Sequence, residues 1–508
     1  MGSPYHRCAD GEWRECPSSV NQTPRLPRLK WTGDLQNLLL AVSLVLTIFV
    51  FWGPSLLGSL ERPSVQGVVE QRQLELQALA SQAVDKGNFT FPPGRGAPLL
   101  SRQLFGADTL QNLADVLRQR RDNATTTDRD LRLRQVLVLL ATRQPEQARA
   151  LLESPPPAVG QEESSAAVVL QQALLQRADG NPTTVARLQD LAPEALEDAL
   201  PHHPLYQSLA CSVLDLNHPF CHGSHGGALV RLVLVGLVGP LAALAGILLW
   251  LAQLGRWLWS RNQSQRPPSQ APPSQPMAAP LTTPALMLFF FGGVVVLGNG
   301  GGVLALSALQ PWIRASGSTG QAMATMLVYG AQALPGLAVL RWLRRSEGQS
   351  GWQWLQWNLG WRSLAMALGG LLLSLPLVLL TSWGVSRLFP HGGGSNPLLD
   401  LVLNSRDLTA LMFFALTACL LAPLYEELVF RATVLPTMVG SCGAGVGVLL
   451  SSLLFAAAHL SLVEFFPLLI LGLGLGWLRL RGGRLSACVL MHAMWNGYTL
   501  ANLVLLSL

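Results

Sequence analysis

Long apolar runs dominate this sequence and limit what it can fold into. A run of about 20 apolar residues is enough to cross the hydrocarbon core of a bilayer as a helix. Half of the 508 residues are hydrophobic, and only 13% are charged. We therefore expect an all-α fold, a polytopic helical membrane protein with about nine spans in a lipid bilayer. The runs lie at about 35–60, 227–254, 284–309, 321–340, 363–383, 407–430, 444–462, 465–480 and 485–506.

Basic residues indicate which ends of the spans face the cytoplasm. Arg25, Arg28 and Lys30 precede the first run. They favour a retained signal anchor at 35–60 and a cytoplasmic tail at 1–34 over a cleaved signal peptide. The net charge of +6 is explained better by basic cytoplasmic loops than by nucleic-acid binding, so no nucleic-acid partner is expected. Other basic clusters are Arg256 with Arg261, Arg341 with Arg344 and Arg345, and Arg479 with Arg481 and Arg484.

Residues 61–226 form a long polar insert, which this topology places outside the cytoplasm. They carry 15 Lys and Arg against 19 Asp and Glu, and turn residues divide them into helices. A weak repeat is visible, because Leu139, Pro145 and Ala148 are echoed by Leu174, Pro182 and Ala186. This spacing predicts either tetratricopeptide-like helix pairs or an irregular helical domain. Either form could bind a protein partner.

Several smaller features follow the insert or end it. Cys211 and Cys221 flank a short polar loop and either form a disulfide or remain a free pair. Residues 255–283 are predicted to be a Pro-rich cytoplasmic linker, followed by a membrane core at 284–508. Five histidines fit no metal site that we can name and are expected to be solvated loop residues. They are His202, His203, His218, His222 and His225.

Two glutamates and an arginine interrupt the run at 407–430. A charged side chain at the centre of a membrane helix costs about 2.5–3.5 kcal/mol, so such residues are candidates for function. Glu426 and Glu427 are adjacent and point about 100° apart on a helix. Glu427 and Arg431 have the spacing of a structural ion pair. Glu426 is then left to face a cavity as a general base toward water.

Two later runs each contribute a histidine. Phe455 precedes His459 by one helical turn, and His492 lies one turn before Asn496. His459 could orient the water, while His492 and Asn496 could donate hydrogen bonds to a developing oxyanion. These are the parts for amide hydrolysis without a covalent intermediate. Taken singly, each polar residue could instead make one structural hydrogen bond or ion pair.

Three motifs within the region 405–500 resemble those of the CPBP (Abi) family of intramembrane proteases. They read Glu426-Glu427-x-x-x-Arg431, Phe455-x-x-x-His459 and His492-x-x-x-Asn496. The family includes the type II CAAX prenyl endopeptidases (CAAX prenyl protease 2) and the lysostaphin resistance protein A-like proteins. The resemblance implies that Glu426 and His459 activate water and that His492 and Asn496 stabilise the oxyanion, with Phe455 as a packing residue.

The resemblance leaves the metal dependence open. Glu426, His459 and His492 could supply three ligands to a zinc ion, with water as the fourth. The resemblance nevertheless favours a glutamate mechanism, so we prefer no metal and no other cofactor.

The motifs also leave more than one function possible. We favour an intramembrane endopeptidase that cuts a membrane-associated protein or peptide. The alternative is a catalytically silent scaffold or assembly factor that binds clients through the insert at 61–226. One geometric difficulty remains: if 407–430 and 444–462 are straight crossings, Glu426 and His459 lie at opposite ends of them. We therefore expect a break in the helix near Pro436, which would allow the two side chains to meet.

Overall fold

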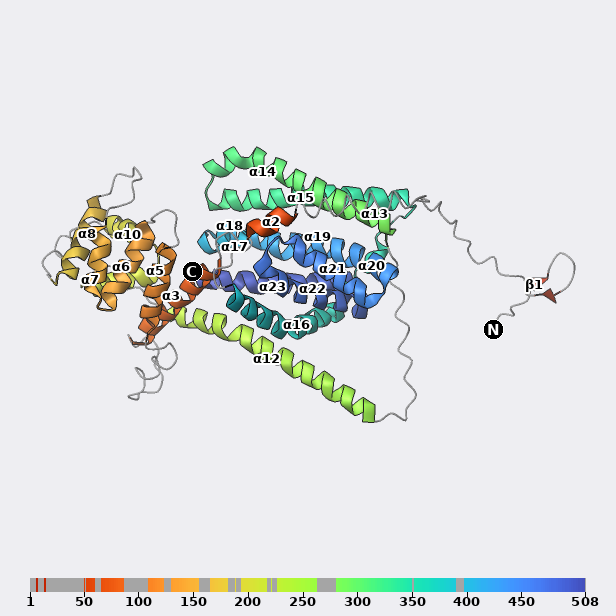
Figure 1. The fold of residues 1–508 in the computed structure, drawn as a ribbon, viewed down its shortest axis with the longest axis horizontal. Helices are drawn as coiled ribbons and strands as arrows, with labels where there is room; N and C mark the ends of the chain where they lie inside the picture. Colours follow the sequence, from red (N-terminus) through yellow and green to blue (C-terminus); the bar gives the residue numbers. More distant parts are fainter. Residues whose placement is uncertain are drawn as a thin grey trace.

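The computed structural model describes residues 6–7, 13–14, 50, 52–59, 65–85, 108–122, 129–154, 165–180, 188, 193–216, 221, 226–262, 280–349, 351–389 and 397–507. A two-stranded antiparallel ladder pairs β1 (His6–Arg7) with β2 (Trp13–Arg14), and the other regular elements in this part of the chain are helical. The expected all-α fold is confirmed. Figure 1 shows a small helical insert beside one end of a larger bundle of long helices.

The insert is a closed bundle of helices. Consecutive helices pack on one another as in a helical repeat, but α11 also returns to contact α3 and α6. The second copy of the predicted repeat falls mostly on residues 181–187, outside the described residues, so the tetratricopeptide-like pattern stays a prediction. The helices are α3 (Val65–Asp85), α5 (Thr109–Asp122), α6 (Arg129–Ala141), α7 (Pro145–Glu153), α8 (Ser165–Ala178), α10 (Pro193–Ala199) and α11 (Pro204–Val213).

A buried glutamate organises the polar core of the insert. Glu75 on α3 is fully buried and accepts a hydrogen bond of 2.6 Å from the Tyr206 hydroxyl. The guanidiniums of Arg72 and Arg134 lie 3.2 and 3.4 Å from its carboxylate oxygens. Burial acts to raise the pKa of Glu75, but His203, the two guanidiniums and the hydroxyl outweigh it and hold that pKa below its ordinary value. This network ties α3, α6 and α11 together.

His203 is buried, so its prediction as a solvated loop residue is wrong. Its Nδ1 accepts a hydrogen bond of 3.2 Å from the amide of Leu205 and thereby caps α11. Its Nε2 lies 3.5 Å from Glu75. Burial lowers the pKa of His203 to about 4. His202 is exposed as expected, whereas His218, His222 and His225 lie outside the described residues.

The insert should lose stability on mild acidification. Unfolded His203 gains a proton near pH 6.5, but folded His203 does so only near pH 4. The unfolded state therefore binds more protons between these values, and the free energy of unfolding falls by on the order of 3 kcal/mol from pH 7 to pH 4. Hydrogen exchange of α11 in the intact protein would measure this. His203→Asn keeps a capping acceptor but does not titrate, so it should flatten the pH dependence; an unchanged slope in that variant would refute the assignment.

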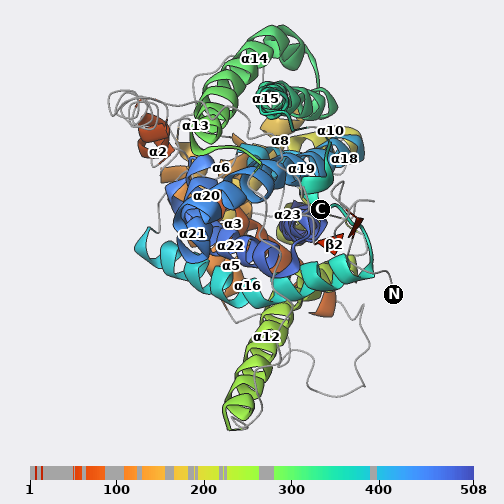
Figure 2. The ribbon, with the colours of Figure 1, turned by 90° about the vertical axis from the view of Figure 1, so that its right-hand side faces the viewer.

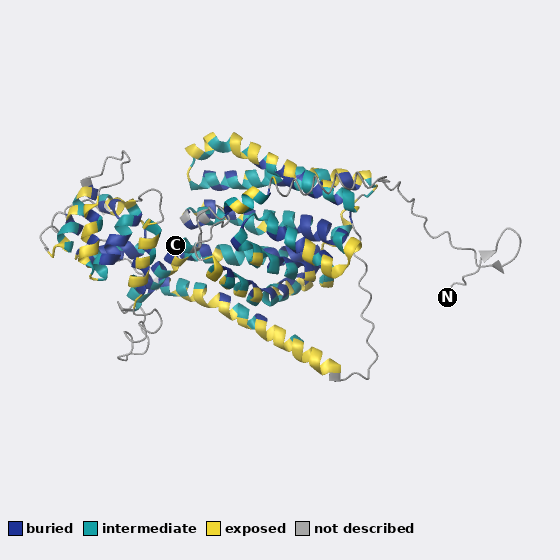
Figure 3. Ribbon diagram, in the orientation of Figure 1, coloured by how far each residue is buried: buried dark blue, intermediate teal, exposed yellow. Residues whose placement is uncertain are grey.

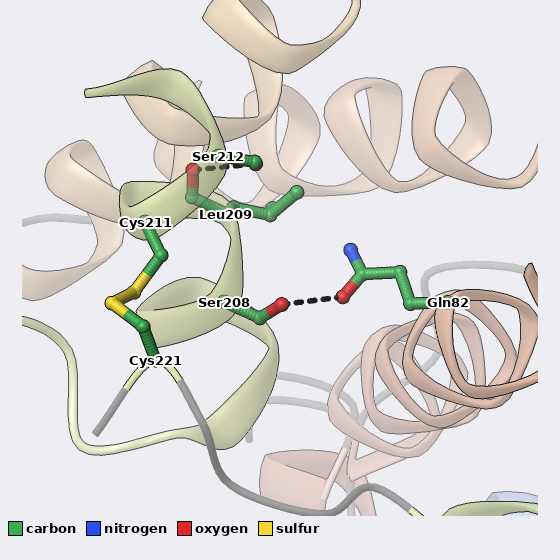
Figure 4. The surroundings of a disulfide bond; sticks show 6 residues. All are labelled: Gln82, Ser208, Leu209, Cys211, Ser212 and Cys221. Carbon is green, nitrogen blue, oxygen red and sulfur yellow. Dashed lines mark hydrogen bonds between the residues drawn. A yellow bond between two sulfur atoms is a disulfide. The ribbon is translucent and has the colours of Figure 1, made fainter. Parts of the chain in front are cut away.

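A disulfide closes the end of the insert. Cys211 on α11 is bonded to Cys221, which decides between the two states that the sequence allowed. Figure 4 shows the bond beside Ser208, whose hydroxyl donates a 2.8 Å hydrogen bond to Gln82 on α3. The bond therefore fixes the chain close to the point where it enters the membrane part.

The membrane part contains six helices in the described residues that are long and apolar enough to cross a bilayer. They are Gly227–Arg261, Thr283–Ala315, Ser318–Ser346, Trp361–Leu388, Leu408–Cys442 and Leu462–Gly482. The elements are α2 (Gly53–Gly58), α12 (Gly226–Asn262), α13 (Thr283–Met287), η4 (Leu288–Leu297), α14 (Gly298–Ala315), α15 (Ser318–Ser346), η5 (Gln353–Leu355), α16 (Trp361–Leu388), α17 (Pro397–Asn404), α18 (Leu408–Leu416), η6 (Thr417–Leu421), α19 (Ala422–Glu427), η7 (Leu428–Val434), α20 (Leu435–Cys442), α21 (Ala444–Ala458), α22 (Leu462–Gly482) and α23 (Leu485–Ser507).

The expected count of about nine spans needs one correction. The run at 444–462 is not a crossing, because α21 has 15 residues and rises only about 22 Å, less than the roughly 30 Å of a bilayer core. With 23 residues, α23 is also long enough to cross a bilayer. It is not one of the six helices above because polar residues such as His492 and Asn496 lower its mean hydropathy. Most of the predicted anchor at 35–60 lies outside the described residues.

Basic residues gather at the end of the bundle away from the insert. Leu506 at the end of α23 packs into the core of the insert, so α23 begins at the far end, next to Arg484. The start of α12 packs on the insert too, and the other end of α12, whose last turn contains Arg261, lies away from the insert (Figure 1). At the far end Trp354 stacks on the Arg344 guanidinium at 4.4 Å, and its carbonyl accepts a hydrogen bond from buried Arg479. This end of the bundle, where the basic clusters meet, is the end that the positive-inside rule predicts to face the cytoplasm.

The outer helices expose apolar side chains. α12 stands off the bundle over its second half, and the α14 and α15 pair forms the opposite flank (Figure 2). Leu241, Leu248 and Trp257 on α12 are each about half exposed. Figure 3 shows this exposed surface along α12 and α14, and lipid is the solvent that such a surface fits.

Candidate active site

A helical hairpin brings Glu426 and His459 to the same depth. The helix Leu408–Cys442 runs without interruption through Pro436, so the expected break at that proline is wrong. The chain turns instead at Gly443, which has a φ of 83°, a conformation that glycine adopts readily. From Glu426 to the turn is about 25 Å of helix, and α21 returns nearly the same distance before it ends at His459. Because the stretch of helix from Glu426 to Gly443 and the helix after Gly443 are nearly equal in length, Glu426 and His459 lie at the same depth.

Glu427 and Arg431 form a buried ion pair. Their carboxylate and guanidinium lie 3.0 Å apart, and both side chains are 1% exposed or less. Arg431 also donates a 3.2 Å hydrogen bond to the carbonyl of Gly472 on α22. Gly472 packs closely on α21, because a Cβ there would lie only 3.0 Å from Ser452. The pair thus anchors the long helix to α22.

Glu427 also orients His492. Its Oε1 lies 2.8 Å from Nδ1 of His492, which is 3% exposed. An ionised carboxylate can only accept hydrogen bonds, so Nδ1 carries the proton. The other ring nitrogen then faces Glu426, and Nε2 lies 3.9 Å from its Oε2. Glu427 therefore fixes the orientation of the His492 ring, with Nε2 on the side of Glu426.

Glu426 faces both histidines across a short gap. Its Oε2 lies 3.8 Å from Nε2 of His459 and 3.9 Å from Nε2 of His492. Within the described part of the chain this oxygen has no hydrogen-bond partner. His459 is held from the other side, because its Nδ1 lies 2.8 Å from the carbonyl oxygen of Phe455. Separations of this size suit one bridging water better than direct hydrogen bonds.

Phe455 packs at the centre of the group. Its ring is fully buried, with centroids 4.8 Å from His459 and 5.7 Å from His492. The Arg431 guanidinium lies 4.3 Å from the same ring. Phe455 thus packs against both imidazoles and against the guanidinium of the ion pair, and it helps to hold the two histidines in position.

The site opens into a cavity of about 830 Å³. Glu426, His459, His492 and Asn496 all line it, and Asn496 also donates a 2.7 Å hydrogen bond to the carbonyl of Ala418. Most of the wall is apolar and comes from α14, α15, α17, α22 and α23. Apolar lining residues include Leu306, Ile313, Val328, Leu398, Leu399, Leu401, Leu468, Trp495 and Leu500.

Metal binding is not indicated by the local arrangement. Over the described ranges, no group of three or more His, Cys, Asp and Glu side chains is arranged to hold a metal ion. The three residues that the sequence offers as zinc ligands are Glu426, His459 and His492. Zinc ligands in proteins lie about 2.0–2.2 Å from the ion. That catalysis needs no metal or cofactor stays a prediction.

The sequence motifs missed Tyr329. Its hydroxyl donates a 3.3 Å hydrogen bond to Oε1 of Glu426 from α15. A signal was present, because Gln321, Thr325, Tyr329 and Gln332 recur at helical spacing in an apolar run and all line the cavity. A polar stripe on a membrane helix indicates a polar cavity rather than lipid.

Comparison with known proteins matches one family. Residues 408–498 match the family model described as Rce1-like, type II CAAX prenyl endopeptidase Rce1-like. No curated protein and no solved structure matches the chain. The match is less than half of the chain and leaves out the insert and α15. It includes every residue of the three motifs, and it confirms the resemblance to the CPBP family of CAAX-type membrane proteases.

Proposed function

We propose that the protein is an intramembrane endopeptidase in which Glu426 activates water to hydrolyse a peptide bond of a membrane-associated protein or peptide. The observation that carries this proposal is the convergence of Glu426, His459 and His492 from three helices on one cavity. A structural role for each residue alone would not require their polar atoms to face one another. The family match supports the same reaction class.

In the proposed first step, a water molecule lies between Oε2 of Glu426 and Nε2 of His459. Glu426 takes a proton from this water as its oxygen attacks the carbonyl carbon of the substrate. His492 and Asn496, at the adjacent wall of the cavity, donate hydrogen bonds to the oxyanion that forms. The tetrahedral intermediate then collapses, the C–N bond breaks, and Glu426 returns the proton to the leaving amine.

The contact between Glu427 and His492 restricts this mechanism. With Nδ1 protonated and bound to Glu427, Nε2 can donate to an oxyanion only when His492 is an imidazolium. A carboxylate oxygen of Glu426 and one of Glu427 each lie within 4 Å of a nitrogen of this ring. Glu427 therefore contributes to the reaction through His492, although it does not line the cavity.

Complete removal of divalent metals should leave the activity unchanged. Under the proposed mechanism the proton acceptor is a carboxylate and the oxyanion donors are side chains, so no Lewis acid is needed. Cleavage of a membrane peptide by the purified protein would be measured before and after exhaustive chelation. Inhibition that added zinc reverses would overturn the metal-free mechanism and would assign Glu426, His459 and His492 as ligands.

The substrate can be identified by comparing membrane proteomes. Cells that carry the wild type and cells that carry Glu426→Gln would be compared for membrane-associated peptides that accumulate uncut. If the protein is a protease, a defined set of peptides should be cut at one end in wild-type cells and remain uncut in cells that carry Glu426→Gln. Identical proteomes, with the variant present at the same level, would contradict the proposed function.

A further inference from the structure

We propose that Tyr329 is a positioning residue that holds one carboxylate oxygen of Glu426 so that the other faces water and substrate. This inference rests on the proposed function and deepens it. It adds to the site a residue on α15, a helix that lies outside the matched residues 408–498.

The two oxygens of Glu426 have different surroundings. Oε1 accepts the hydrogen bond of 3.3 Å from the Tyr329 hydroxyl. Oε2 points toward the two histidines and has no hydrogen-bond partner among the described residues. A carboxylate on an unconstrained glutamate rotates about its last torsion, which is broad and roughly two-fold. A donor on one oxygen restricts this rotation, so Oε2 stays aimed at the water.

The surroundings of Tyr329 suit this role. Its ring is half-buried and meets the ring of Tyr425 edge-on, at a centroid distance of 6.3 Å. α15 in turn packs on α14, η4 and α18, which fix its position against the motif helices. Tyr329 and Glu426 both line the cavity, so the hydrogen bond between them restrains Glu426 at the cavity wall.

Tyr425 provides a matched control. It is a second tyrosine beside the same carboxylate in sequence, and its ring contacts Tyr329. Its hydroxyl, however, is buried and has no hydrogen-bond partner in the described part of the chain. It does not line the cavity. Removal of its oxygen therefore changes the same aromatic pair but leaves Glu426 alone.

The experiment compares steady-state cleavage of a membrane peptide by wild type, Tyr329→Phe, Tyr425→Phe and Glu426→Gln, each purified as the full chain. Tyr329→Phe should lower kcat about tenfold, the effect expected for one hydrogen bond to a charged group, and leave KM within about twofold. Tyr425→Phe should keep the wild-type kcat. Thermal unfolding of each variant checks that neither substitution acts through folding.

The outcomes separate this inference from the proposed function. If Glu426→Gln is inactive and Tyr329→Phe keeps the wild-type kcat, the positioning role is wrong and the protease assignment stands. Equal losses of kcat in both tyrosine variants, or a loss that appears only in KM, would also overturn the role. If the wild type cleaves no membrane peptide, including any that accumulates with Glu426→Gln, the proposed function itself fails.

Discussion

Glu426→Gln should reduce peptide hydrolysis by roughly 10³-fold and leave the protein folded in the membrane. Glutamine has nearly the same shape and can still accept the hydrogen bond from Tyr329, but it cannot take a proton from water. Glu426 is partly exposed to the cavity and is not the partner of Arg431, so its charge is not needed to neutralise a buried cation. Initial rates of cleavage by the purified variant and its thermal unfolding temperature measure the two parts of this prediction.

Glu347→Gln is the control for loss of a carboxylate. Glu347 follows the end of α15, away from the cavity, and accepts a hydrogen bond from Thr282. This variant should cleave at the wild-type rate. If Glu426→Gln also kept the wild-type rate and cellular function, the motif helices would serve only the fold, as a scaffold requires.

Arg431→Met should destabilise the protein by about 3–5 kcal/mol. Removal of the guanidinium leaves Glu427 as a fully buried carboxylate without its cation, and it also removes the hydrogen bond to the Gly472 carbonyl. Methionine fills much of the same space, so the effect is mainly the uncompensated charge. The free energy of unfolding can be followed by denaturant titration of the protein in mixed micelles.

The double variant Glu427→Gln/Arg431→Met isolates the charge effect. It removes both members of the pair, and it should recover part of the stability lost in Arg431→Met. It should remain poorly active, because a neutral glutamine cannot hold His492 with the charge-assisted hydrogen bond that the Glu427 carboxylate makes. An Arg431→Met variant as stable as the wild type would show that this pair does not hold the long helix in place.

The residues that line the site could be found in the sequence because polar groups in apolar helices are rare and costly. The spacing of Glu427 and Arg431 predicted an ion pair, and the structure contains it. The spacing of His492 and Asn496 predicted a shared face, and both line the cavity. The contact of Glu427 with His492 was not foreseen, because helical spacing says nothing about contacts between helices.

The path of the chain between the motifs was predicted less well. Hydropathy marks apolar runs but not where a helix turns, so it predicts a crossing at 444–462 and suggests a break at Pro436, whereas the chain turns at Gly443. Pro436 closely follows η7, a π-helical stretch in which the backbone hydrogen bonds already depart from the regular α pattern, so the continuous helix accommodates the proline. His459 ends its helix, and the following residue Leu460 has a φ of 51°, which apolar periodicity could not reveal. The buried state of His203 was missed for a similar reason, since its partner Glu75 is far away in sequence.

The most direct test of the central claim is a single-turnover cleavage assay with purified protein in proteoliposomes. The substrate is a membrane peptide that accumulates with Glu426→Gln, and mass spectrometry identifies the new ends. The wild type should produce one defined cut, and Glu426→Gln should produce essentially none at equal amounts of folded protein. Cleavage of the peptide by both proteins at similar rates would contradict the assignment of Glu426 as the base.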